Sequence, residues 1–296
     1  MTLRLVLISL MLVTSFASAA SAISITTTTN GAALQAALGG AGMTLNSVVV
    51  SNGSPVQYGT YTGFTAGPVT IANGVVMSTG EVAQTTPAFN NGLQGTSSTP
   101  STSTGMPGTP EFDAYGPGHI TAFAESSDVA VLTVTFTLAA PSQIGFDFIF
   151  GSVEYPQFTS SFTDAFVAFL DGTGTANQIV FDGTGAAVQV GATFAAVLRT
   201  DDQNTAFANP HGLVKLTTFT TTQLSAGVHT LAFEIGDVND DILDSAVFLA
   251  NLRAGAGQGG TNPTDPTDPT PVPEPSSLIL LGIGIAGLCA RAFRQN

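Results

Sequence analysis

The chain has 296 residues, of which 44% are hydrophobic and only 9% are charged. Long helical surfaces need Glu, Lys and Arg, so this composition excludes a mainly helical protein and favours strands joined by turns. Acidic residues outnumber basic ones by 20 to 6. A surface this negative repels phosphate backbones, which argues against nucleic acid as a partner.

The N-terminal segment has the order of parts of a secretory signal peptide. Arg4 precedes an apolar run over residues 5–16, and small residues then offer two A-x-A cleavage sites, at 17–19 and 20–22. This order predicts that residues 1–22 are removed on export. An uncleaved N-terminal anchor is the alternative.

One short helix is predicted at residues 30–40, with Asn30 as its N-cap, Leu34 and Leu38 on one face, and a glycine pair as its stop. Residues 84–118 are dominated by Thr, Ser, Pro, Gly and Asn and predict a long loop. Elsewhere, runs of β-branched and aromatic residues bounded by turn residues predict strands. These strands are predicted at residues 45–51, 56–62, 75–78, 129–138, 144–150, 164–170, 178–181, 187–190, 193–198, 213–219, 228–235 and 245–252.

Two of these strands are expected to form the centre of the core. In the first, Ile144, Phe146, Phe148 and Phe150 share one face. The second, at 164–170, is apolar on both faces, as expected of a strand covered on each side.

Many short strands with no helix between successive ones predict one all-β domain at residues 23–254. Its expected architecture is an antiparallel β-sandwich of jelly-roll type, with two smaller sandwiches as the alternative. The only cysteine is Cys289, near the C-terminus, so this domain is held together without disulfides.

The composition changes after the predicted domain. Residues 255–271 are rich in glycine and then in a Thr-Asp-Pro repeat, which predicts an extended spacer. A Val-Pro-Glu-Pro sequence, an uncharged apolar run at 276–290 and two terminal arginines follow. This order predicts a tail helix inserted in a membrane with its arginines on the cytoplasmic side, although the run is shorter than the ~20 residues of a comfortable span. The residues assigned to this signal are Val272, Pro273, Glu274, Pro275, Arg291 and Arg294.

The tail at residues 272–296 resembles the PEP-CTERM sorting signal, which exosortases of Gram-negative bacteria recognise. The resemblance implies export by the secretion machinery and anchoring in the inner membrane by the tail. It also implies processing by exosortase and delivery to the cell surface or to the exopolysaccharide matrix. An ordinary C-terminal membrane anchor is the alternative.

Three motifs of the predicted domain resemble the choice-of-anchor L domain: FIFGSVEYP at 148–156, FTDAF at 162–166 and DSAVF at 244–248. That family recurs in bacterial surface proteins with various C-terminal anchors, so the resemblance implies surface display and no particular activity. Val153 and Thr163 depart from the usual pattern, which has an acid and an asparagine there. If those positions bind a ligand, this chain is expected to bind it less well.

The candidate metal site is a loop at residues 236–244 that is dense in oxygen ligands, which suit Ca²⁺. It is not an EF-hand, because Ile242 occupies the position that needs glycine and Phe248 the position that needs glutamate. Two acids from the central strand pair complete the site if the fold brings the loops together, and a solvated acidic turn is the alternative. The candidate ligands are Asp237, Asn239, Asp240, Asp241, Asp244, Glu154 and Asp164.

No catalytic pattern is found in the sequence: its three histidines form no metal-binding spacing, and no G-x-S-x-G elbow occurs. We therefore assign no catalytic residue and expect no enzyme. The predicted role is structural or adhesive, at the cell surface or in a biofilm matrix. The alternative is a secreted carbohydrate-binding or carbohydrate-active module, with tyrosines stacked on sugars. The tyrosines considered for this are Tyr58, Tyr61, Tyr115 and Tyr155.

Overall fold

The computed structural model describes residues 23–64, 71–89, 99–182, 184–191, 205–207, 212–219 and 223–255, with the backbone alone for 212–219. The predicted signal peptide, the spacer beyond residue 255 and the predicted tail helix lie outside these ranges. The strands are β1 Ser24–Thr27, β2 Gly39–Ala41, β3 Thr44–Asn52, β4 Tyr58–Thr62, β5 Asn73–Ser78, β6 Ser126–Leu138, β7 Ile144–Ser152, β8 Ala165–Leu170, β9 Val188–Gln189, β10 Gly212–Phe219, β11 Gly227–Val238 and β12 Ser245–Ala254. The α-helices are α1 Gly31–Leu38 and α2 Pro110–Tyr115.

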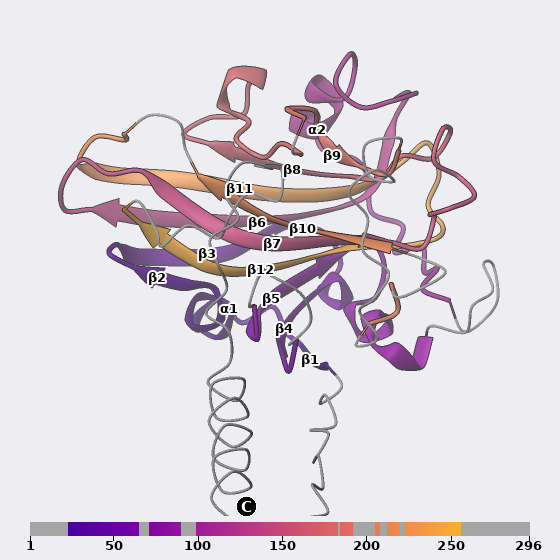
Figure 1. The fold of residues 1–296 in the computed structure, drawn as a ribbon, viewed down its shortest axis with the longest axis horizontal. Helices are drawn as coiled ribbons and strands as arrows, with labels where there is room; N and C mark the ends of the chain where they lie inside the picture. Colours follow the sequence, from indigo (N-terminus) through magenta and orange to yellow (C-terminus); the bar gives the residue numbers. More distant parts are fainter. Residues whose placement is uncertain are drawn as a thin grey trace, which may run out of the picture. The chain divides into compact units, whose positions relative to one another are not determined.

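The described strands form two sheets that lie one above the other (Figure 1). One sheet has seven strands, in the order β1-β4-β5-β12-β7-β10 with β2 paired to β12, and the other has five, in the order β3-β6-β11-β8-β9. All pairings are antiparallel except the short parallel pair of β2 and β12. The predicted all-β class is confirmed.

From β5 to β12, consecutive strands alternate between the two sheets, apart from β8 and β9, which pair with each other. Apart from β8, each strand from β5 to β11 is therefore followed by a connection that crosses from one layer to the other. Because of this alternation, loops from both sheets meet at the two ends of the strands, where ligand sites of such folds can form.

The main core lies between the sheets and contains the predicted phenylalanine face of β7. Phe146, Phe148 and Phe150 are all fully buried. Phe146 packs edge-on against Phe233 of β11 at a centroid distance of 4.9 Å, and Phe148 lies 5.2 Å from Phe166 of β8. Burying each ring contributes about 2–3 kcal/mol, so this face is a main source of the stability of the sandwich.

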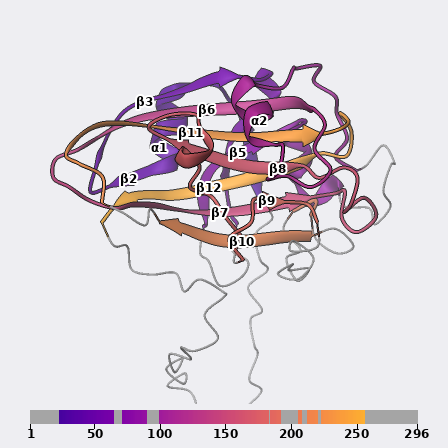
Figure 2. The same cartoon turned by 90° about the horizontal axis from the view of Figure 1, so that it is seen from above.

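A second apolar cluster covers the outer face of β8, and the helix α2 packs over it. Val167 and Phe169 of β8 cluster there with Phe112 and Tyr115 of α2, and Figures 1 and 2 show α2 beside the five-stranded sheet. This explains why β8 is apolar on both faces, as the sequence predicted. The prediction that residues 84–118 form a loop is wrong at α2, which Thr109 caps by accepting a hydrogen bond from the Phe112 N–H.

The predicted N-terminal helix is confirmed. Asn30 accepts a hydrogen bond of 3.0 Å from the Ala33 N–H, and Leu34 and Leu38 are buried in the main core. The glycines after the helix also begin β2, which was not predicted. Neither α-helix in the described part of the chain has the length and apolar character needed to cross a membrane.

Two predicted strands are not seen as such. The strand predicted at 178–181 is wrong: it reduces to one bridge between Phe169 and Gln178. The reason is local, since the Gln178 side chain bonds both the N–H and the carbonyl of Val180 and so takes up the groups that a ladder would use. The strand predicted at 193–198 lies outside the described residues.

Candidate functional site

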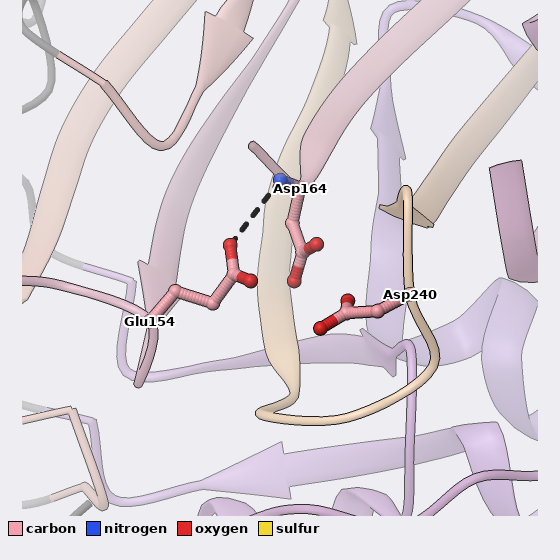
Figure 3. Close-up of side chains that lie close together, drawn as sticks. All are labelled: Glu154, Asp164 and Asp240. Atoms are coloured by element: carbon pink, nitrogen blue, oxygen red, sulfur yellow. Dashed lines mark hydrogen bonds between the residues drawn. The ribbon is translucent and has the colours of Figure 1, made fainter. Parts of the chain in front are cut away.

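Three carboxylates from three separate segments meet at one end of the sandwich (Figure 3). Glu154 lies just beyond the end of β7, Asp164 directly before β8, and Asp240 in the loop after β11. One oxygen of each lies within 4.8 Å of the corresponding oxygens of the other two. The sequence predicted all three as candidate ligands, and the structure brings them together.

The pairing of the strands explains why these loops converge. Ala165, at the start of β8, pairs with Gly236 near the end of β11. In the other sheet, Ser152 at the end of β7 pairs with Ser245 at the start of β12. The ends of β7 and β11 and the starts of β8 and β12 therefore lie at the same end of the sandwich.

Asp164 is fully buried and is held by donors from two strands. Its Oδ1 accepts a hydrogen bond of 3.2 Å from the Val238 N–H, and its Oδ2 accepts one of 2.7 Å from the Ser245 hydroxyl. Its own N–H donates to Oε2 of Glu154 at 3.4 Å (Figure 3). Because Val238 and Ser245 belong to different sheets, this carboxylate also ties the two layers together.

A tight turn fixes the position of Glu154. Its N–H donates to the Ser152 hydroxyl at 3.0 Å, and its carbonyl accepts hydrogen bonds from the N–H groups of Gln157 and Phe158. The side chain is completely buried. Its carboxyl is thereby aimed from the β7 loop towards Asp164 rather than into solvent.

Asp237 and Asp244 lie next to this group and are also completely buried. Neither oxygen of Asp237 accepts a hydrogen bond of good geometry, although Asp164 and the Thr79 hydroxyl lie beside it. One oxygen of Asp244 accepts from the Thr102 N–H at 2.9 Å, and the other has no donor. Gly80 makes room for that second oxygen, since a Cβ at this position would lie only 1.9 Å from it.

Burial and repulsion between acids raise the pKa of the five carboxyls of Glu154, Asp164, Asp237, Asp240 and Asp244. Burial, followed by the charges of Asp164 and Asp240, raises the pKa of Glu154, and burial together with Asp164 raises that of Asp237 well above its usual range. Burial raises the pKa of Asp164 despite its two hydrogen bonds. Burial and Asp241 raise that of Asp240 to about 6, while burial raises that of Asp244 to about 7. A protein that keeps these groups ionised must supply a compensating positive charge.

Besides Asp237 and Asp244, which lie next to the group, two more of the predicted ligands lie outside it. Asn239 links its loop to two other segments: its Oδ1 accepts a hydrogen bond of 2.8 Å from the Ala124 N–H, and its Nδ2 donates to the carbonyls of Ala122 and Ser161. Asp241 is exposed and does not belong to the group of three. The hydroxyls of Thr79 and Ser245 were not predicted, because isolated Ser and Thr residues carry no recognisable spacing.

The interpretation of the tyrosines as a sugar-binding platform is wrong for three of the four. Tyr58, Tyr61 and Tyr115 are at most 2% exposed, so their rings cannot stack on a sugar at the surface. Tyr155 is half-buried and packs against the main core.

Comparison with protein families identifies the domain that carries the acidic cluster. A family model described as the choice-of-anchor L domain matches residues 23–252 of the 296-residue chain. The chain belongs to the choice-of-anchor L family. All the carboxylates described above lie within its choice-of-anchor L domain.

A second model, the PEP-CTERM protein-sorting motif, matches residues 271–295. Both resemblances noted from the sequence are therefore confirmed. The motif indicates that this choice-of-anchor L protein is exported and sorted to the cell surface. A search of curated proteins and a search of solved structures each gave no match.

Proposed function

We propose that the protein is a non-catalytic component of the cell surface or of the surrounding exopolysaccharide matrix, with a structural or adhesive role. The observation that carries this proposal is the order of the two matched segments, a choice-of-anchor L domain at 23–252 followed by a sorting motif at 271–295. We infer that the domain is a sandwich of jelly-roll type, since its strands alternate between sheets. Such a domain can be displayed as a folded unit.

The route that we propose has two processing steps. Residues 1–22 are removed on export, and the apolar run at 276–290 holds the chain in the inner membrane until exosortase acts near Val272–Pro275. The spacer at 255–271 keeps the folded domain clear of the membrane during this step, because its Thr-Asp-Pro repeat is rich in proline and stays extended.

The burial of the carboxylates supports a role other than glycoside hydrolysis. Glu154 and Asp164 are the pair that could resemble the acid and nucleophile of a glycosidase, but both are fully buried. A glycosidic bond must lie between two such carboxyls, so their burial is an argument against that role. The buried tyrosines weaken the carbohydrate-binding alternative in the same way.

The sorting proposal is tested by the intact mass of the mature protein from strains with and without exosortase. We expect the tail to be absent from the first product and present in the second. Glu274→Gln should retain the tail in the exosortase-positive strain, whereas Asp268→Asn, a matched change in the spacer, should be processed normally. Equal masses from the two strains would count against exosortase processing.

The non-catalytic proposal is tested by incubating the purified protein with the native exopolysaccharide and measuring new reducing ends. We expect none above the buffer control. Release of reducing sugar that increases with protein concentration would instead establish the carbohydrate-active alternative.

A further inference from the structure

We propose that the carboxylates of Glu154, Asp164 and Asp240 bind one Ca²⁺ ion, which joins the loop after β7 to the loop after β11. This inference goes beyond the export and surface role of the chain. It does not depend on whether exosortase processes the tail.

The spacing of the three carboxylates fits one shared ion. Figure 3 shows the three carboxyl groups turned towards one another from separate segments. Oxygens on opposite sides of a Ca²⁺ ion lie about 4.6–5.2 Å apart, since each is about 2.3–2.6 Å from the metal. The three oxygens lie within 4.8 Å of one another, which is the range of separations found between oxygens that share one Ca²⁺ ion.

Asp237 provides a second and independent indication. Its carboxyl is fully buried beside Asp164, yet neither oxygen accepts a hydrogen bond of good geometry. An ionised carboxyl left in this state is strongly destabilising, so native proteins pair or ligate such groups. One oxygen each of Asp240 and Asp244 also lacks a donor. Unsatisfied acceptors therefore occur both in the group of three, at Asp240, and on Asp237 beside Asp164.

Within the described residues, no side chain of opposite charge acts on Asp164, Asp237 or Asp240. The charged groups that act on Asp164, Asp237 and Asp240 are other carboxyls. The ion pairs among the described side chains lie elsewhere, between Arg253 and Asp147 and between His229 and Asp171. A bound cation supplies a positive charge that the described neighbours of these three aspartates do not provide.

The donor set selects Ca²⁺ among the common divalent ions. The group consists of carboxylate oxygens, whereas Zn²⁺ sites are usually built with nitrogen or sulfur ligands. Mg²⁺ usually keeps several waters in a strict octahedron, which is difficult beside the fully buried Glu154 and Asp164. Ca²⁺ accepts irregular sets of protein oxygens, and Asp240, which is only half-buried, provides the side open to solvent.

The experiment is calorimetric titration of the full chain, freed of metal with EDTA and dialysed, with CaCl2 and separately with MgCl2. We expect one Ca²⁺ per chain and at least about tenfold weaker binding of Mg²⁺. At a Ca²⁺ concentration about a hundred times the Kd, the Tm should rise by about 5–10 °C over the value in EDTA. Absence of binding heat together with an unchanged Tm would overturn the proposal, and would mean that the carboxyls are neutralised by protons.

Two neighbouring substitutions provide a matched pair. Asp240→Asn removes a ligand charge at a half-buried position and should weaken Ca²⁺ binding by about tenfold or more. Asp241→Asn makes the same chemical change at the exposed neighbour and should leave the affinity within about twofold. Equal losses in the two variants would show a diffuse charge effect instead of a site and would overturn the assignment.

Asp237→Asn tests the unsatisfied carboxyl itself. Because it removes a repulsive charge, the variant should have an unchanged or higher Tm in EDTA, and a smaller rise on addition of Ca²⁺. A lower Tm in EDTA would mean that the fold already compensates Asp237 without an ion, and the proposal would fail.

Discussion

Asp128 and Asp237 are both fully buried aspartates on the paired strands β6 and β11, yet their surroundings differ completely. Asp128 accepts three hydrogen bonds, from the N–H and hydroxyl of Thr104 and from the Met106 N–H, at 2.7–2.8 Å. Asp237 accepts none of good geometry. The domain thus surrounds Asp128 with hydrogen-bond donors but does not do so at Asp237. The two positions are close, since Asp237 pairs with Ser127, the residue before Asp128.

The difference separates two ways of compensating a buried charge. At Asp128 the compensation is built from the chain, because the segment at 104–106 wraps around the carboxylate and donates to both oxygens. At Asp237 the charged neighbours are acids and only the Thr79 hydroxyl lies beside it as a donor, so the compensating charge must come from a bound cation or from protons. A carboxylate of the first kind stabilises the fold by itself, whereas one of the second kind stabilises it only together with its ligand.

The largest effect is expected at the satisfied carboxylate. Asp128→Ala leaves two backbone N–H groups and a hydroxyl without their acceptor, and loses about 4 kcal/mol of unfolding free energy, because each bond to a charged acceptor is worth at least about 1.5 kcal/mol. Alanine is also strained at the φ of 48° that this residue adopts. Urea unfolding monitored by circular dichroism measures the change.

Asp128→Asn is the control for this prediction. Asparagine tolerates the positive φ and keeps an acceptor oxygen, so it should lose roughly half as much stability as alanine. If the unfolding free energies of both variants lie within about 0.5 kcal/mol of the wild-type value, the hydrogen bonds to Asp128 do not stabilise its buried charge. The contrast drawn with Asp237 would then be wrong.

Glu234 is an intermediate case and gives the next largest effect. It is 2% exposed and has one donor, the Thr109 hydroxyl at 2.8 Å. Burial, with a further contribution from Glu111, raises its pKa from 4.5 to about 7. The neutral form is therefore favoured by the fold: its stabilising effect is complete below pH 4.5 and is lost as the pH rises through about 7.

Glu234→Gln should remove this dependence. Between about pH 4.5 and pH 8, the wild type should lose up to about 3 kcal/mol more stability than the variant, since each pKa unit corresponds to about 1.4 kcal/mol. Unfolding curves for both proteins at each pH measure the difference, in which the titration of the other carboxyls cancels. Glu125→Gln, at an exposed position, should show the same change of unfolding free energy with pH as the wild type. If the unfolding free energies of the wild type and Glu234→Gln change with pH in parallel, Glu234 ionises in the folded protein without loss of stability, and the prediction is wrong.

The sequence predicted those features of the fold and of the acidic cluster that depend on local pattern. Alternation in β7 identified the face of Phe146 and Phe148, and the acids of the β11 loop identified the candidate ligands. Helix α2 was missed because six residues within a Pro- and Thr-rich segment are too few to show a helical period.

The division of roles within the acidic loop could not be predicted, because it depends on long-range pairing and on backbone direction. Asn239 has a φ of 74°, which turns its side chain towards the carbonyls of Ala122 and Ser161 instead of towards Asp164. Asp237 follows a register shift in the pairing of β11 with β6, after the point where the sequence pattern ends the strand. Neither feature has a signature in residue type or spacing.

The smallest effect is expected at Asp171, a carboxylate that already has a cation. Its Oδ2 lies 2.6 Å from Nδ1 of His229, whose Nε2 faces the Ser225 carbonyl. Burial lowers the pKa of His229, but the hydrogen bonds and charge of these two partners outweigh it, so that the pKa is raised overall. The ion pair therefore stabilises the fold below about pH 6.5 and ceases to do so as the pH rises through the higher folded pKa.

Asp171→Asn should lower the unfolding free energy by less than about 1 kcal/mol at pH 6, because the aspartate side chain is 41% exposed and water screens the pair. At pH 8.5 the difference from the wild type should be smaller still, since asparagine keeps the φ of 55° and can accept the Thr230 N–H, which now bonds Oδ1. Chemical denaturation at the two pH values measures both differences, and equal losses at each pH would contradict the ion pair. An exposed carboxylate can obtain its compensation from water, so its cation adds little. Asp237 is shielded from water and lies beside other acids, so water cannot compensate its charge. For that reason Asp171→Asn should slightly lower the stability, whereas Asp237→Asn should leave it unchanged or raise it in the absence of a metal ion.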